Sequence, residues 1–192
     1  MKIIPIEAER SRHPHRRLIF PLSLLLALLS CNAPVRAAVL HEGKIGVLYH
    51  DIGFWGGSGK EEGIDFNAEL IFSPSIQLMG GKLRPNLGIS LNSSGATSKL
   101  YGGGVWEYIG SSSWFIDLGL GLAAHDGEID DEAGDDRSQL GSALLFRLSF
   151  EAGFDLSPHH RLSLLFDHIS NGYLADPNEG LDTLGIRYGY WF

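Results

Sequence analysis

The chain alternates apolar and polar residues in short segments that recur from residue 44 to its end. This period of two predicts β-strands, and no stretch after residue 38 has the three-to-four spacing of an amphipathic helix of useful length. The alternating segments lie near residues 44–54, 64–72, 83–91, 97–108, 114–122, 144–151, 161–170 and 183–192. The pattern therefore predicts an all-β meander of eight strands.

The two faces of these strands differ sharply in character. One face carries charged residues and many glycines, and the other is rich in leucine, with Trp and Tyr towards the strand ends. A small barrel can fill its interior with small residues and ion pairs while it turns an apolar belt with aromatic girdles to lipid. The charged positions are Asp65, Glu69, Arg84, Glu107, Asp117, Arg147, Glu151, Asp167 and Arg187. We therefore expect an eight-stranded antiparallel up-and-down transmembrane β-barrel without an aqueous pore, and the alternative is a secreted soluble barrel of the lipocalin type.

The two ends of the chain agree with an exported barrel. Arg16 and Arg17 precede an apolar run over residues 18–29 and a Pro-Val-Arg-Ala-Ala stretch over residues 34–38, which is the order of a secretory signal peptide. The run is too short to span a bilayer as a helix. We expect cleavage after Ala37, so that 1–37 is a signal peptide and 38–192 the barrel domain, with lipidation at Cys31 as the alternative. The alternation up to Phe192 resembles the terminal signature of bacterial outer-membrane barrels.

Charge and cysteine content exclude several functions. The net charge is −8 at pH 7, and residues 1–37 hold six of the 15 Lys and Arg but two of the 23 Asp and Glu, so the mature chain is more acidic still. Nucleic acid is therefore not an expected partner. Cys31 is the single cysteine, so neither disulfides nor cysteine metal sites are expected. An acidic run over 125–136 lacks the spacing of a calcium loop, and we expect it to be solvated rather than to hold a metal ion.

Candidate chemistry gathers near the end of the segment 161–170. His168 and Ser170 share the apolar face of one strand, and Asp182 has the apolar parity of the next strand. A serine becomes a nucleophile when a base takes its proton and an acid orients that base, and the amide of Asn171 could support an oxyanion. With both chain ends on the periplasmic side, Ser170 lies at the cell surface, at the depth of the outer leaflet. Ionisable groups on a lipid face persist chiefly where they function, so any catalyst there would act on a lipid.

Two motifs in this region resemble a known family. His168-Ile-Ser-Asn-Gly172 and Pro177-Asn-Glu-Gly-Leu-Asp182 are similar to the lipid A 3-O-deacylases of the PagL type, with general agreement in strand order over 43–192. The resemblance implies an outer-membrane barrel that hydrolyses the ester-linked acyl chain at position 3 of lipid A, with lipopolysaccharide as substrate and no metal or other cofactor. It implies Ser170 as nucleophile, His168 as general base, and Asn171 with Asn178 as oxyanion support.

The acid departs from the family pattern. Family members use a Glu that follows a Pro-Asn-x-Gly turn, whereas here Asp182 occupies that place and Glu179 lies within the turn. Strand parity favours Asp182 and residue type favours Glu179. We prefer Asp182, because orienting a histidine depends more on geometry than on which carboxylate supplies it.

Two other functions remain open from the sequence. One is a lipid A acyltransferase barrel, which would need an acceptor site. The other is a non-catalytic outer-membrane barrel for adhesion or surface protection. The sequence also leaves open whether the barrel is a monomer or a homodimer.

Overall fold

The computed structural model describes residues 39–57, 59–130 and 136–192. The expected signal peptide and Cys31 lie outside these residues. The strands are β1 (Leu40–Tyr49), β2 (Ile64–Phe72), β3 (Ile76–Leu78), β4 (Gly81–Asn92), β5 (Lys99–Ile109), β6 (Trp114–His125), β7 (Leu144–Ser157), β8 (His160–Ser170) and β9 (Leu181–Trp191). In the described part of the chain, no helix has the length and apolar character needed to cross a membrane.

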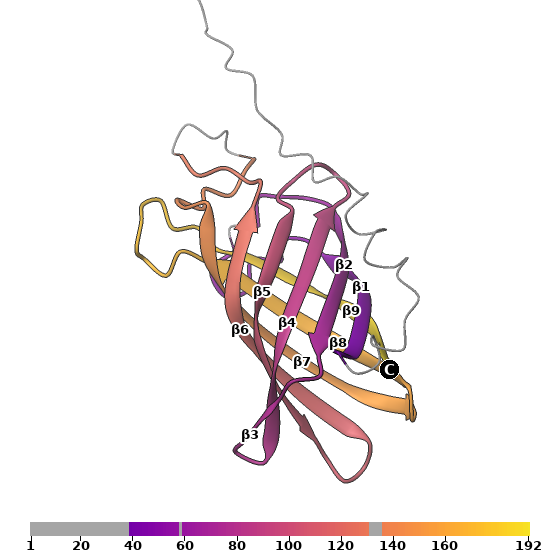
Figure 1. The fold of residues 1–192 in the computed structure, drawn as a ribbon. Coiled ribbons are helices and arrows are strands. Elements are labelled where there is room, and N and C mark those ends of the chain that lie inside the picture. Colours follow the sequence, from indigo (N-terminus) through magenta and orange to yellow (C-terminus); the bar gives the residue numbers. More distant parts are fainter. Residues whose placement is uncertain (1–38, 58, 131–135) are drawn as a thin grey trace, which may run out of the picture. The chain divides into compact units, whose positions relative to one another are not determined.

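Eight of the strands close into a barrel. Each of them pairs antiparallel with its neighbour in the order β2, β1, β9, β8, β7, β6, β5, β4, and β2 pairs with β4 to complete the ring. Short β3 pairs only with β4 and extends one hairpin beyond the ring. The prediction of an eight-stranded up-and-down barrel is confirmed (Figure 1).

Burial shows which face of each strand points inward. Ile45, Leu120 and Ile186 are 61%, 67% and 60% exposed, whereas Arg161 and Arg187 are each 1% exposed. A soluble barrel would bury the first group and expose the second, because burial of apolar area drives folding in water. The distribution is that of a transmembrane barrel, so the lipocalin-type alternative is wrong.

Ion pairs fill the interior. Lys44 Nζ lies 2.6 Å from Asp117 Oδ2 and 2.9 Å from Glu151 Oε2, and all three side chains are at most 4% exposed. Buried charges persist only when they are paired, so each contact stabilises groups that the narrow lumen has removed from water. Further pairs of this kind are Lys99–Asp167, Arg147–Asp167, Arg161–Glu42, Arg161–Glu107 and Arg187–Glu69.

The two ends of the barrel differ in the length of their connections. The described parts of the loops between β1 and β2 (50–57, 59–63) and between β6 and β7 (126–130, 136–143) share one end with the loops 93–98 and 171–180 (Figure 1). The connection 73–80, which contains β3, and the turns 110–113 and 158–159 share the other end. Transmembrane barrels have short periplasmic turns and longer extracellular loops. The loop end is therefore the extracellular one, and β8 reaches it at Ser170 as expected.

The end of the first strand departs from the sequence prediction. The first strand ends at Tyr49 rather than near residue 54, because positive φ angles at Asp51 (45°) and Gly53 (62°) turn the chain out of the sheet.

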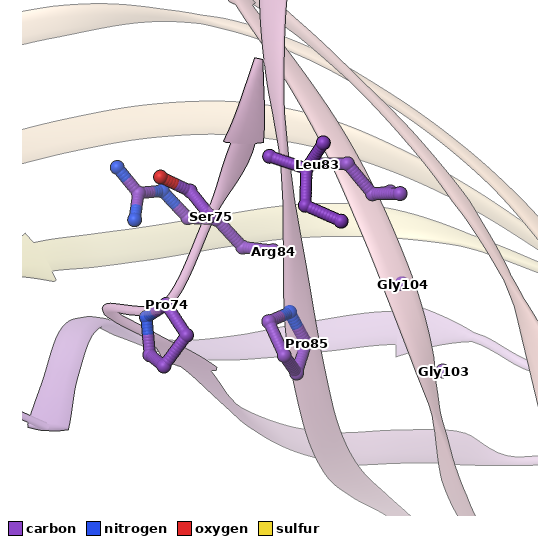
Figure 2. Close-up of a pocket in the computed structure, with 8 residues that line it drawn as sticks. Pro74, Ser75, Leu83, Arg84, Pro85, Gly103 and Gly104 are labelled. Atoms are coloured by element: carbon purple, nitrogen blue, oxygen red, sulfur yellow. The ribbon is translucent and has the colours of Figure 1, made fainter. Parts of the chain in front are cut away.

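At the periplasmic end, the hairpin that contains β3 borders an apolar pocket of about 370 Å³ on the outer wall, and Figure 2 shows Pro74 and Pro85 at its edge. This pocket lies at the opposite end of the barrel from Ser170.

Candidate active site

The candidate residues lie in one row across four strands. In the antiparallel register, Leu120 of β6 stands opposite Leu148 of β7, Leu148 opposite His168 of β8, and His168 opposite Asp182 of β9. All four have the outward parity of their strands, and Ser170 is the next outward residue along β8. The row begins as an apolar stripe on the outer wall and ends at an imidazole and a carboxylate.

His168 contacts both a carboxylate and a hydroxyl. Its Nδ1 lies 2.6 Å from Asp182 Oδ1, and its Nε2 lies 3.0 Å from Ser170 Oγ. A neutral imidazole satisfies both contacts when Nδ1–H donates to Asp182 and Nε2 accepts the Ser170 proton. The side chain of His168 is 14% exposed and that of Asp182 is fully buried. The arrangement can move a proton from the serine to the histidine.

The second oxygen of Asp182 is held by the loop 50–63. Oδ2 accepts hydrogen bonds from the backbone N–H groups of Trp55 (2.5 Å) and Gly57 (3.2 Å). The carboxylate is thus fixed through both oxygens, which prevents its rotation away from His168. The strand pattern gave no indication of this loop, although its two adjacent aromatics between glycines, Phe54 and Trp55, were a usable signal.

Two glycines allow the loop to come this close. A Cβ on Gly180 would lie 2.8 Å from His168 Cε1 and 2.9 Å from the carbonyl oxygen of Gly56, and Gly180 N donates to that oxygen at 2.7 Å. A Cβ on Gly57 would lie 3.2 Å from Asp182 Oδ2. Side chains at either position would push the loop away from the imidazole and carboxylate.

The two ends of the loop 50–63, where it joins β1 and β2, are held together by a buried cluster of charged side chains, which we call the root of the loop. His50 Nδ1 lies 2.8 Å from Asp65 Oδ1, its Nε2 lies 3.0 Å from Glu61 Oε2, and all three side chains are fully buried. Burial opposes the charged imidazole, but the hydrogen bonds to Asp65 and Glu61 outweigh it and raise the pKa of His50 to about 9. Burial likewise disfavours the charged form of Glu61, but hydrogen bonds from His50, Thr97 and Ser138 lower its pKa to about 2. The cluster is therefore an ion pair near neutral pH.

Glu179, the alternative acid, serves a different contact. Its Oε1 accepts from Lys60 Nζ at 2.6 Å and its Oε2 accepts from the backbone of Gln139 at 2.8 Å. Partial burial opposes its ionisation, but the bond from Lys60 and the bond from Gln139 hold the pKa of Glu179 below its usual range. Glu179 thus joins three extracellular loops to one another, whereas Asp182 contacts His168.

The two asparagines predicted to support an oxyanion occupy different places. Asn171 is 3% exposed, and its Nδ2 donates to the carbonyl oxygens of Leu140, Ala175 and Pro177 at 2.8 to 3.1 Å. Its amide braces the loop 171–180 instead of facing a reacting group. Asn178 lines the pocket beside Ser170, and its buried Oδ1 has no hydrogen-bond partner.

A pocket of about 350 Å³ opens beside Ser170. Its lining combines apolar and aromatic residues with a few polar ones, as in sites that bind a largely apolar ligand. The lining residues are Trp55, Gly56, Leu120, Phe146, Arg147, Leu148, His168, Ser170, Tyr173, Asn178 and Gly180. In the residues that the structure describes, no group of three or more His, Cys, Asp or Glu is placed to hold a metal ion.

The apolar outer belt, the ion-paired interior and the site on the outer wall define an outer-membrane β-barrel with a Ser, His and Asp cluster at its extracellular end. The sequence profile of the family described as lipid A 3-O-deacylase (PagL) matches residues 52–191. The chain belongs to this family, and the resemblance seen in the sequence is confirmed.

The chain is also similar to individual relatives and solved structures. The chain is 39% identical over 54 residues to the lipid A deacylase PagL of Bordetella bronchiseptica, a match that covers 28% of this chain and only 30% of that relative's length. The crystal structure of the outer membrane enzyme PagL superimposes with a TM-score of 0.57 at 24% identity, covering 77% of this chain and 97% of that one. A de novo designed transmembrane β-barrel gives a TM-score of 0.50 at 16% identity over 81% of this chain and 96% of the design. The two structures show the fold.

Proposed function

We propose that this protein hydrolyses the 3-O-linked acyl ester of lipid A in the outer leaflet, with Ser170 as nucleophile, His168 as general base and Asp182 as orienting acid. The observation that carries the proposal is the continuous chain of contacts from Asp182 through His168 to Ser170, on the lipid-facing wall at the extracellular end. Family membership supplies the substrate class. An ester in the surrounding lipid can reach this wall without leaving the membrane.

The geometry supports a two-step acyl transfer. Ser170 Oγ attacks the acyl carbonyl carbon while its proton passes to His168 Nε2, and Asp182 stabilises the resulting imidazolium. The tetrahedral intermediate collapses when His168 returns the proton to the departing sugar oxygen, which leaves an acyl-serine and a free 3-hydroxyl. Water then attacks the acyl-serine with His168 again as base, and the fatty acid departs as Ser170 regains its proton.

The pocket supplies the remaining parts of the reaction. Its apolar wall, with Phe146 opposite Ser170 and Leu148 opposite His168 in the register, suits an acyl chain that lies along the outside of the barrel. The side-chain amide of Asn178 is the better candidate for the oxyanion donor, since it lines the pocket whereas the amide of Asn171 is engaged by three carbonyls.

Mass spectrometry of lipid A from cells with and without the protein tests the proposal. Wild-type protein should remove one acyl mass, and Ser170→Ala should abolish this loss while the barrel still folds and inserts. Ser112→Ala, in an exposed periplasmic turn, is the matched control and should cleave like wild type. Near-wild-type cleavage by Ser170→Ala would refute the nucleophile, and an acyl group recovered on a second lipid would indicate a transferase instead.

A further inference from the structure

One short segment of the loop 50–63 contacts both the acid and the base of the site. Phe54 and Trp55 fold down onto the outer wall, where the ring of Phe54 meets Phe166 edge-on at 5.7 Å and the indole of Trp55 stacks on Phe166 at 6.4 Å. The same indole stacks on the imidazole of His168, with centroids 5.4 Å apart and planes 28° apart. Trp55 also donates its backbone N–H to Asp182.

These contacts leave the imidazole little freedom to turn. His168 is held at Nδ1 by Asp182, and one face of its ring is covered by Trp55. Asp182 in turn is held through Oδ2 by the amides of Trp55 and Gly57. Nε2 therefore stays directed at Ser170, whose Oγ lies 3.0 Å away.

The indole also changes the electrostatics of proton transfer. When Ser170 attacks, His168 acquires a positive charge beside the face of an aromatic ring. Indole has the most favourable face of the aromatic side chains for a cation, and the attraction strengthens where water is excluded. This interaction is stronger in the transition state than in the resting enzyme, which is the condition for accelerating the chemical step.

From these contacts we infer that Trp55 is a positioning residue of the hydrolase, which orients His168 through its ring and Asp182 through its backbone N–H and stabilises the imidazolium during acyl transfer. The inference deepens the proposed function and rests on it. A purely structural reading is that Trp55, which is 58% exposed, only anchors the loop in the lipid headgroup region. Phe54 is 79% exposed and contacts Phe166. It would serve as such an anchor equally well, which makes it the matched control.

The test uses the full barrel in detergent with one covalent probe and one substrate. Labelling of Ser170 by a fluorophosphonate measures the reactivity of the serine without lipid A, and a soluble short-chain ester gives kcat and KM separately. Trp55→Leu should slow labelling and lower kcat by about tenfold with little change in KM. Trp55→Phe should recover most of both rates because it restores an aromatic face, and Phe54→Leu should stay within about twofold of wild type.

The outcomes separate this inference from the function on which it rests. Labelling of Trp55→Leu at the wild-type rate, equal losses in Phe54→Leu, or a change confined to KM would overturn the role of Trp55 while Ser170 remains the nucleophile. Failure of Trp55→Phe to recover more activity than Trp55→Leu would also overturn it. If wild-type Ser170 is not labelled at all, the proposed function itself fails and the role of Trp55 fails with it.

Discussion

Asp182 stands directly opposite His168 across the β8–β9 ladder, and its Oδ1 lies 2.6 Å from His168 Nδ1. A directly opposite pair has its Cβ atoms close together, so a short aspartate is long enough to reach the ring. An aspartate at this position therefore reaches His168. The second oxygen of the carboxylate is turned towards the loop 50–63.

The acid can be identified by exchanging each carboxylate for its amide. Asp182→Asn should reduce lipid A deacylation by at least about a hundredfold, since an amide in this place favours the wrong tautomer of His168. Glu179→Gln should stay within about threefold of wild type, because it weakens partly exposed contacts with Lys60 and with the backbone of Gln139 rather than a contact with His168. Initial rates of acyl release measure both effects. The reverse ranking would show that Glu179 is the acid in the working enzyme.

Neighbouring residues on β8 should separate stability from activity. Asp167 points inward and pairs with Lys99 (2.6 Å) and Arg147 (2.7 Å), so Asp167→Asn should destabilise the barrel by about 3 to 5 kcal/mol by leaving buried cations under-compensated. His168→Asn should abolish deacylation and change stability by no more than about 1 kcal/mol. Urea unfolding in lipid vesicles, followed by tryptophan fluorescence, measures the stability of both variants. A strongly destabilised His168→Asn would contradict this division between the two faces.

A methyl group at residue 180 should lower the activity by displacing the imidazole of His168. Gly180→Ala places a Cβ 2.8 Å from His168 Cε1, so we expect a loss of about tenfold or more in kcat as the ring shifts from Ser170. Gly43→Ala is the control, because its Cβ meets nothing closer than 3.5 Å. Rates with a soluble ester, together with a gel assay for the folded barrel, measure the effect. Equal activity of the two variants would show that the close approach of the loop is not needed.

The buried ion pair of His50 and Glu61 should make the conformational order of the loop 50–63 depend on pH. The pKa of His50 is raised from 6.5 to about 9, so its contribution is complete below pH 6.5 and disappears as the pH rises through 9. Glu61 is shifted from 4.5 to about 2, so its contribution is complete above pH 4.5 and disappears as the pH falls through 2. The His50 shift corresponds to a stabilisation on the order of 3 kcal/mol.

Hydrogen exchange of the loop amides, corrected for the intrinsic pH dependence, measures this effect. Protection in the wild type should be greatest between about pH 4.5 and 6.5 and should fall towards pH 9. His50→Gln should flatten the alkaline side of the profile. A wild-type profile that is flat up to pH 10 would exclude a charged His50 at the root of the loop.

Removal of divalent cations should leave the chemistry intact. A serine activated by histidine needs no metal to create its nucleophile, so turnover of a soluble ester should persist in EDTA. A soluble substrate is required because cations also alter how lipid A is presented in a membrane. A saturable calcium requirement with that substrate would point to another mechanism.

Much of the fold and part of the site could be predicted from local pattern alone. Strand alternation assigned the inward Asp167 and the outward His168, because a period of two fixes the face of every residue once one face is known. The same parity led to Asp182 in preference to Glu179. The end of the first strand was wrong, since the turn at Asp51 depends on backbone angles that the apolar pattern does not encode.

Contacts between distant segments were beyond that pattern. Trp55 and Asp182 are separated by 127 positions in the sequence, and only the closure of the barrel between β1 and β9 brings them together. Asn171 was predicted to face a reacting group because it follows Ser170, but its amide donates to two carbonyls of its own loop and to that of Leu140 in a neighbouring loop. Loop conformation is set by such tertiary contacts, which strand parity cannot reveal.

The ion-paired interior has a consequence for the cell that carries this barrel. Lys44, Asp117 and Glu151 lock together across the lumen at 2.6 and 2.9 Å, and Arg161 and Arg187 are each 1% exposed. A lumen filled with matched charges resists the passage of both anions and cations. The barrel can therefore span the outer membrane without opening a path for dissolved ions through its lumen.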